Sequence, residues 1–86
     1  MKISVELTLS PLQNDFEPPI IHLIKKLRNS DFTVIENPLS TQVYGEYDAL
    51  MSFLKDEIRT VFEMMDQGLL FLKIVKTDRS DYEPHF

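Results

Sequence analysis

The chain of 86 residues has no cysteine and only two glycines. Without cysteine it forms no disulfide, no thiolate nucleophile and no Cys-ligated zinc or iron–sulfur site. Two glycines are too few for a Gly-rich phosphate loop. No apolar run approaches the roughly 20 residues of a membrane span, and Met1-Lys2 leads directly into alternating residues instead of an apolar signal region. We therefore expect a cytoplasmic protein without a membrane partner.

Positive charge is also scarce, because 9 Lys and Arg residues stand against 14 Asp and Glu residues, for a formal net charge of -5. Nucleic-acid binding needs a surplus of Lys and Arg on one face, so this balance argues against it. The two histidines, His22 and His85, have no spacing that indicates a catalytic triad or a metal-binding pair. We expect no nucleic-acid partner, no metal ion, no cofactor and no enzymatic activity.

The beginning of the chain has the pattern of a half-buried strand. Over residues 2–10, Ile3, Val5, Leu7 and Leu9 alternate with polar residues, so one face is apolar and the other polar. Further strands are predicted over residues 32–36, 39–47 and 69–76. Gly45, inside the third strand, indicates a bulge or a close backbone approach.

Two helices are predicted between these strands. Apolar residues recur at helical spacing after Pro18 and again after Asp48. We expect Asp15 or Glu17 to cap the first helix and Asp48 to cap the second.

The resulting order, βαββαβ, predicts an α+β fold. It is the ferredoxin-like sandwich, in which two helices cover one face of a four-stranded antiparallel sheet with the strand order 4-1-3-2. We expect one domain over residues 1–79 and a polar tail over residues 80–86, which is either mobile or an arm onto a neighbouring molecule.

The face of the sheet that the helices leave open is predicted from the alternation of the strands. It carries carboxylates, hydroxyls, a lysine and two aromatic rings: Ser4, Glu6, Thr8, Gln42, Tyr44, Glu46, Phe71 and Lys73. This mixture is typical of a ligand-binding surface or of a subunit interface. The pattern leaves both interpretations open, and both can hold where a pocket forms between subunits.

Residues 37–46, with the sequence NPLSTQVYGE, are the most informative segment and are followed by Asp48 and an apolar helix. The segment resembles the hairpin of the thiamine-binding domain family, whose pattern is Pro-Met-Ser-Thr-x-x-x-Gly-Glu. Leu39 stands where methionine is commoner, a nearly isosteric change. The Leu-Ser-Pro-Leu exit of the first strand is also similar to that family.

The resemblance implies binding of thiamine or of its hydroxymethylpyrimidine part, without turnover, in a homodimer or homotetramer built through the sheet. A carboxylate would pair with the cation or the amino group, hydroxyls and an amide would bond the pyrimidine edge, and an aromatic ring would stack. The candidate ligand-binding residues are Glu6, Thr8, Ser40, Thr41, Gln42, Tyr44, Glu46 and Phe71. By parity, Thr41 can instead face the helix-side core, and Ser40 can serve backbone groups near Pro38.

Three other functions fit the same topology. An oligomeric scaffold without a ligand is the main alternative. An acylphosphatase-type enzyme needs an arginine in the loop after the first strand, but residues 11–14 read PLQN. An RNA-recognition domain needs aromatic and basic residues on the third strand, which are missing, and a charge of the opposite sign.

Overall fold

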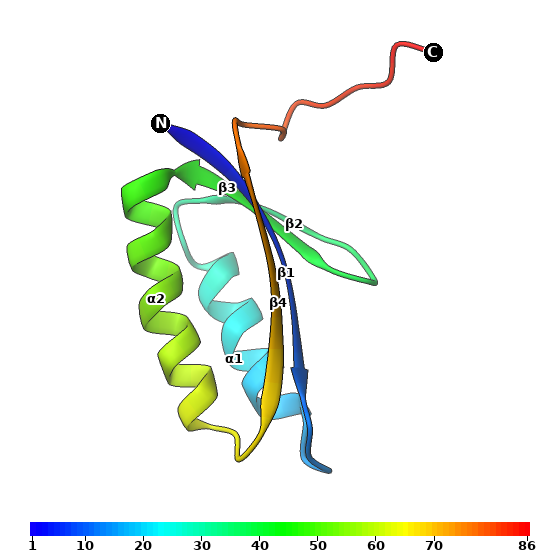
Figure 1. Cartoon of the computed structure of the whole chain (residues 1–86). Helices are drawn as coiled ribbons and strands as arrows, with labels where there is room; N and C mark the ends of the chain where they lie inside the picture. Colours follow the sequence, from blue (N-terminus) through cyan, green and yellow to red (C-terminus); the bar gives the residue numbers. More distant parts are fainter.

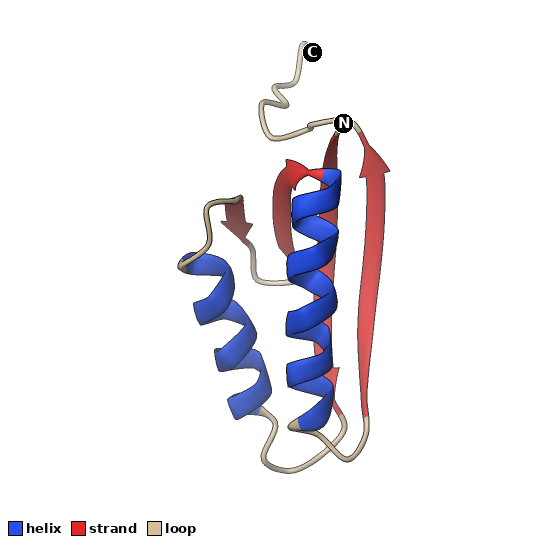
Figure 2. Cartoon of the chain, turned by 90° about the vertical axis from the view of Figure 1, so that its left-hand side faces the viewer, coloured by secondary structure: helices blue, strands red, loops and turns tan.

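Four strands and two helices follow one another in the predicted order βαββαβ. The computed structural model describes residues 1–86. Its elements are β1 (Lys2–Pro11), α1 (Glu17–Arg28), β2 (Thr33–Glu36), β3 (Thr41–Glu46), α2 (Tyr47–Glu63) and β4 (Gly68–Lys76). Both helices pack on the same face of the sheet, as Figures 1 and 2 show. Neither helix has the length and apolar character needed to cross a membrane.

The sheet is antiparallel, with the order β2-β3-β1-β4. This arrangement confirms the ferredoxin-like prediction, with β1 and β3 at the centre and β2 and β4 at the edges. β3 is shorter than predicted, because the chain pairs with β1 only from Thr41 onward. Residues 37–40 therefore form a connection that projects beyond the paired part of the hairpin.

The core lies between the sheet and the helices, on the side that the alternation of β1 predicts. Its nine buried apolar residues are Ile3, Val5, Leu7, Leu23, Leu27, Val43, Leu50, Leu54 and Val61. Each such side chain stabilises the fold by about 1.5–3 kcal/mol relative to an exposed one. Both helices contribute to this core, which fixes their position over the sheet.

The register confirms the predicted open face. Glu6 lies opposite Gln42 on β3 and opposite Lys73 on β4. Ser4 is paired with Tyr44, and Thr8 with Phe71. Since directly paired residues point to the same side of a sheet, these side chains share the face that carries no helix.

The predicted caps of both helices are wrong. Phe16 precedes α1 as its N-cap residue and makes no side-chain hydrogen bond to the helix. A cap would bond the second or third N–H group of the helix, but Pro18 and Pro19 occupy these positions and have none. In α2 the cap is Glu46, whose Oε1 accepts from the Asp48 N–H at 3.3 Å.

The predicted bulge at Gly45 is absent, because Gly45 pairs with Ile3 in an unbroken register. A Cβ atom at this position would lie 2.5 Å from Cδ1 of Phe32. An aromatic side chain, and not another backbone, therefore makes the close approach.

Candidate functional site

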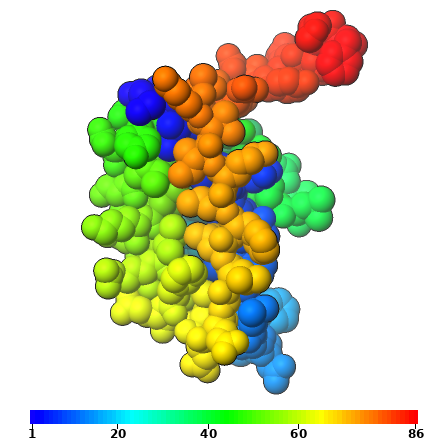
Figure 3. Space-filling view, viewed as in Figure 1, coloured from blue at the N-terminus to red at the C-terminus, as the bar shows by residue number.

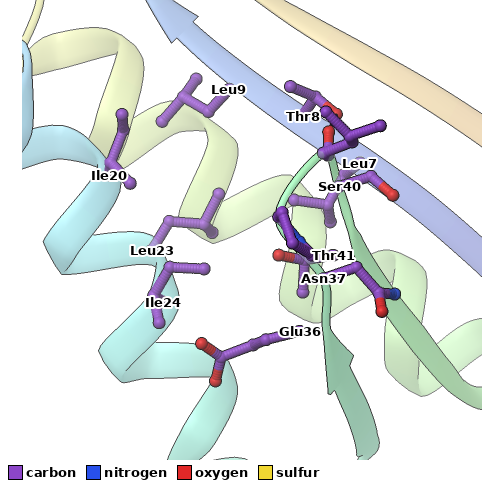
Figure 4. A pocket seen from close by; sticks show the side chains of 12 residues that line it. Leu7, Thr8, Leu9, Ile20, Leu23, Ile24, Glu36, Asn37, Ser40 and Thr41 are labelled. Atoms are coloured by element: carbon purple, nitrogen blue, oxygen red, sulfur yellow. The ribbon is translucent and has the colours of Figure 1, made fainter.

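A pocket of about 210 Å³ opens between α1 and the connection from β2 to β3 (Figure 4). One wall is apolar and consists of Ile20, Leu23 and Ile24 of α1 with Leu7 and Leu9 of β1. The other wall is the largely polar segment from Glu36 to Thr41. An apolar cleft with a few convergent polar groups is the usual form of a small-molecule site.

One hydrogen bond closes the turn of the polar wall, and two more hold the wall against β1. The Asn37 N–H donates to the carbonyl oxygen of Ser40 at 2.9 Å, which closes the turn. Thr8 Oγ1 donates to the carbonyl oxygen of Leu39 at 3.1 Å. Ser40 Oγ donates to Oε2 of Glu6 at 3.0 Å. The wall is therefore a fixed turn that is bonded to the central strand.

Figure 4 shows Leu23 and Ile24 on one side of the pocket, with Asn37 and Thr41 on the other. Thr41 is paired with Leu7 and is only 7% exposed, so its side chain faces the helix side of the sheet. This is one of the two orientations that the sequence pattern left open. The Asn37 side chain is exposed and carries both a donor and an acceptor. Asn37 thus lies across the pocket from an aliphatic surface.

Glu36, at the edge of the pocket, is already paired. Nε and Nη2 of Arg28 donate to its two carboxylate oxygens at 2.7 and 2.8 Å. These hydrogen bonds hold the pKa of Glu36 below its ordinary value. The bidentate pair connects the end of α1 to the end of β2.

A second cluster of polar side chains lies on the open face of the sheet. Nζ of Lys73 is 3.7 Å from Oε1 of Glu6, and the Tyr44 hydroxyl donates to Oε1 of Gln42 at 3.2 Å. These residues line a shallow hollow of about 260 Å³ together with Ser4 and Arg79. The hollow lies on the open face, whereas the apolar wall of the first pocket lies on the helix side, and the Ser40–Glu6 hydrogen bond connects the two places.

Glu46 and Phe71 line neither the pocket beside α1 nor the hollow that contains Lys73 and Arg79. Oε2 of Glu46 accepts from the N-terminal ammonium at 2.7 Å, and this bond holds the pKa of Glu46 below its ordinary value. Glu46 therefore fastens the start of the chain to the start of α2. Phe71 is 60% exposed, next to Thr8 near the sheet edge.

The eight predicted site residues are therefore divided. Thr8, Ser40 and Thr41 line the pocket beside α1, whereas Glu6, Gln42 and Tyr44 line the hollow on the open face. The sequence did not point to the wall formed by α1 or to Asn37 as parts of the same pocket. The signal was weak, because the apolar stripe of an amphipathic helix does not show which of its residues will border a cavity.

No protein-family model and no curated protein matches this sequence. Several solved structures are similar. A protein from Streptococcus pneumoniae is 29% identical, with 91% of this chain and 89% of that chain covered and a TM-score of 0.82. A protein from Thermotoga maritima, for which a role in thiamine biosynthesis or salvage has been suggested, is 23% identical, with coverage of 90% and 85% and a TM-score of 0.79.

A domain of unknown function from Bacillus cereus, DUF77, is 14% identical, with 96% of this chain and 83% of that chain covered and a TM-score of 0.74. Together these structures show that the whole ferredoxin-like unit, and not a part of it, is shared with known proteins.

Proposed function

We propose that the chain binds thiamine or its hydroxymethylpyrimidine part, without turnover, in the pocket between α1 and residues 37–41. The observation that carries the proposal is that this segment forms the polar wall of a pocket whose opposite wall is aliphatic. Two further observations support the ligand class. The segment resembles the hairpin of the thiamine-binding domain family, and a thiamine-related role has been suggested for the structurally similar Thermotoga maritima protein.

The chemistry of the pocket fits an aminopyrimidine. A flat heteroaromatic ring can pack against Leu23 and Ile24 while its nitrogen edge faces the Asn37 amide, which both donates and accepts. The Ser40 hydroxyl is oriented by Glu6 at 3.0 Å, so its oxygen remains an acceptor for an amino group. Glu6 then acts as a positioning residue from the other side of the sheet.

The volume favours the pyrimidine part over the whole vitamin. Pockets for drug-sized ligands usually measure about 300–1,000 Å³, whereas this one measures about 210 Å³. The thiazolium ring of an intact thiamine would therefore extend from the mouth into solvent. We expect thiamine and hydroxymethylpyrimidine to bind with affinities within about tenfold of each other, which corresponds to a difference of about 1.4 kcal/mol.

Isothermal titration calorimetry with both ligands tests the proposal, with two variants of the same helix. Ile24→Phe fills the pocket and should weaken binding at least about tenfold, since it occupies the ligand's volume. Ile21→Phe makes the same chemical change on the outer side of α1, where Ile21 is 45% exposed, and should bind as the wild type does. No heat from either ligand, or equal binding by Ile24→Phe, would refute the proposal.

Self-association through the sheet is the second candidate function, and β4 favours it. This edge strand pairs only with β1, and Leu69, Phe71, Leu72 and Ile74 are all exposed on it. Figure 3 shows β4 along the surface for the whole length of the strand. Exposed apolar side chains on an unpaired edge are typical of a subunit contact.

We propose a homodimer or homotetramer that forms through this surface and is compatible with ligand binding. Phe71→Ser should lower the mass measured by light scattering to that of the monomer. Leu39→Ser, a change at an even more exposed apolar residue in the β2–β3 connection, should not. A wild-type protein that is monomeric at high concentration would contradict this second proposal and leave the first one standing. A cytoplasmic location stays a prediction from the sequence.

A further inference from the structure

The residues that follow β4 return onto the open face of the sheet and are fixed there by one serine. Ser4, on the central strand β1, is only 7% exposed. Its Oγ donates to the carbonyl oxygen of Thr77 at 2.7 Å and accepts from the Arg79 N–H at 2.8 Å. One hydroxyl group thus satisfies two backbone groups of a segment more than 70 positions away in the sequence.

The backbone at Thr77 is strained. Its φ angle is 132°, and it is the one non-glycine residue with a positive φ. A β-branched residue rarely adopts this conformation, which persists only where the surroundings fix it. The two hydrogen bonds of Ser4 supply this constraint, and the resulting turn directs Arg79 toward the open face. Strain of this kind is concentrated at ligand-binding sites and other functional positions.

The turn brings Arg79 to the same hollow as Lys73. The hollow of about 260 Å³ is lined by Ser4, Glu6, Gln42, Tyr44, Lys73 and Arg79, with two valines. Nε of Arg79 donates to Oγ1 of Thr77 at 3.2 Å, which holds the guanidinium while its two terminal nitrogens have no protein partner. Lys73 lies 3.7 Å from Glu6, too far for a good hydrogen bond.

Donors therefore outnumber acceptors in the hollow. Two cations face one carboxylate, although the whole chain carries a net charge of -5. Oε2 of Glu6 accepts from Ser40, and Oε1 of Gln42 accepts from Tyr44, so the Gln42 amide directs its N–H groups away from that bond. Arginine, lysine and amide donors from three different segments surround the same volume.

We propose that this hollow binds the phosphate group of a small phosphorylated molecule. The terminal N–H groups of Arg79 and the ammonium of Lys73 donate charge-assisted hydrogen bonds to the phosphate oxygens, and the Gln42 amide donates a further one. None of these three residues lines the pocket beside α1, so the site does not rest on the proposed pyrimidine binding. The Ser4 contact makes the site dependent on the segment after β4.

Titration with inorganic phosphate, followed by amide chemical shifts at constant ionic strength and neutral pH, tests the proposal. We expect saturable shifts at Ser4, Gln42 and Arg79. Arg79→Gln and Lys73→Gln should each weaken binding about tenfold, as the loss of a charge-assisted hydrogen bond predicts. Arg59→Gln removes the same charge from α2, where Arg59 is exposed and has no ion pair, and should bind phosphate as the wild type does.

Three results would overturn the proposal. Shifts that do not saturate would mean that no site exists. Equal weakening by Arg59→Gln would show that the effect is one of net charge. Binding of acetate as tightly as phosphate would contradict a site built for phosphate. Ser4→Ala serves as a further variant, because it should weaken phosphate binding by releasing the segment while the protein stays folded by circular dichroism; unchanged binding in that variant would exclude the serine from the site.

Discussion

Replacing Gly45 with alanine tests why the hairpin motif contains a glycine. The added Cβ would lie 2.5 Å from Cδ1 and 3.0 Å from Cε1 of Phe32. The ring cannot move freely, because it packs edge-on against Phe53 with a centroid distance of 5.4 Å and borders the core. Overpacking of this kind costs about 1–3 kcal/mol, whereas replacing a strand glycine with alanine recovers about 0.5–1 kcal/mol.

We therefore expect Gly45→Ala to lower the free energy of unfolding by about 1.3 kcal/mol, the difference between the midpoints of these two ranges. For a domain of this size that corresponds to a fall in Tm of about 4–8 °C for each kcal/mol. Urea and thermal unfolding followed by circular dichroism measure both quantities. In a Phe32→Leu background the clash is smaller, so the same alanine should cost less or become stabilising.

A Gly45→Ala protein as stable as the wild type would refute this reasoning. So would an equal loss in the Phe32→Leu background, because the cost would then not come from the ring. The expected result would assign the glycine of the motif to the fold and not to ligand contact.

Three further predictions concern polar contacts outside the pocket. The N-terminal ammonium lowers the pKa of Glu46 from its ordinary 4.5, so its carboxylate stabilises the fold above pH 4.5 and loses this effect as the pH falls through the lowered pKa. Glu46→Gln should therefore flatten the acid side of a stability profile measured in urea, and an unchanged profile would contradict the contact. Ser4→Ala should cost about 1 kcal/mol and should raise the amide hydrogen-exchange rate of Arg79; an unchanged rate would show that the contact is dispensable. His22 and Glu57, joined at 3.1 Å between the helices, should show a coupling of about 0.5–1 kcal/mol in a double-mutant cycle in urea, and additive losses would rule the interaction out.

The sheet could be predicted because β1 alternates without interruption. Ile3, Val5 and Leu7 define one face, and period-two geometry then assigns every paired residue on β3 and β4 to a side. The observed pairs of Glu6 with Gln42 and Lys73 follow from that single pattern. A strand with one buried face leaves little freedom of register, so this part of the structure is contained in local sequence.

The helix caps could not be predicted from the same local signals. Asp48 is a good cap residue, but α2 already begins at Tyr47, so Asp48 lies inside the helix. The cap is the extended residue Glu46, whose carboxylate accepts from the Asp48 N–H. The contact of Glu46 with the N-terminal ammonium joins residues 45 positions apart, and no pattern near Glu46 indicates it. Tertiary contacts of this kind override local preferences.

The candidate site was predicted only in part, for a related reason. Ser40 and Thr41 of the motif line the pocket, and whether they contact a ligand stays a prediction; the motif contains no information about the opposite wall. The alternation of β1 placed Glu6 and Thr8 on the open face, as the register shows, whereas Thr41 of the motif is paired with Leu7 on the helix side. The hollow on the open face also depends on Arg79, whose position results from the turn after β4.

The most direct test of the proposed function is the crystal structure of the protein with hydroxymethylpyrimidine bound. We expect the pyrimidine ring to lie between Ile24 and Asn37, with its nitrogen edge toward the connection from β2 to β3. A ligand found instead on the open face, beside Tyr44 and Phe71, would contradict the assignment of the pocket. A pocket that stays empty in crystals grown at saturating ligand would contradict the binding function itself.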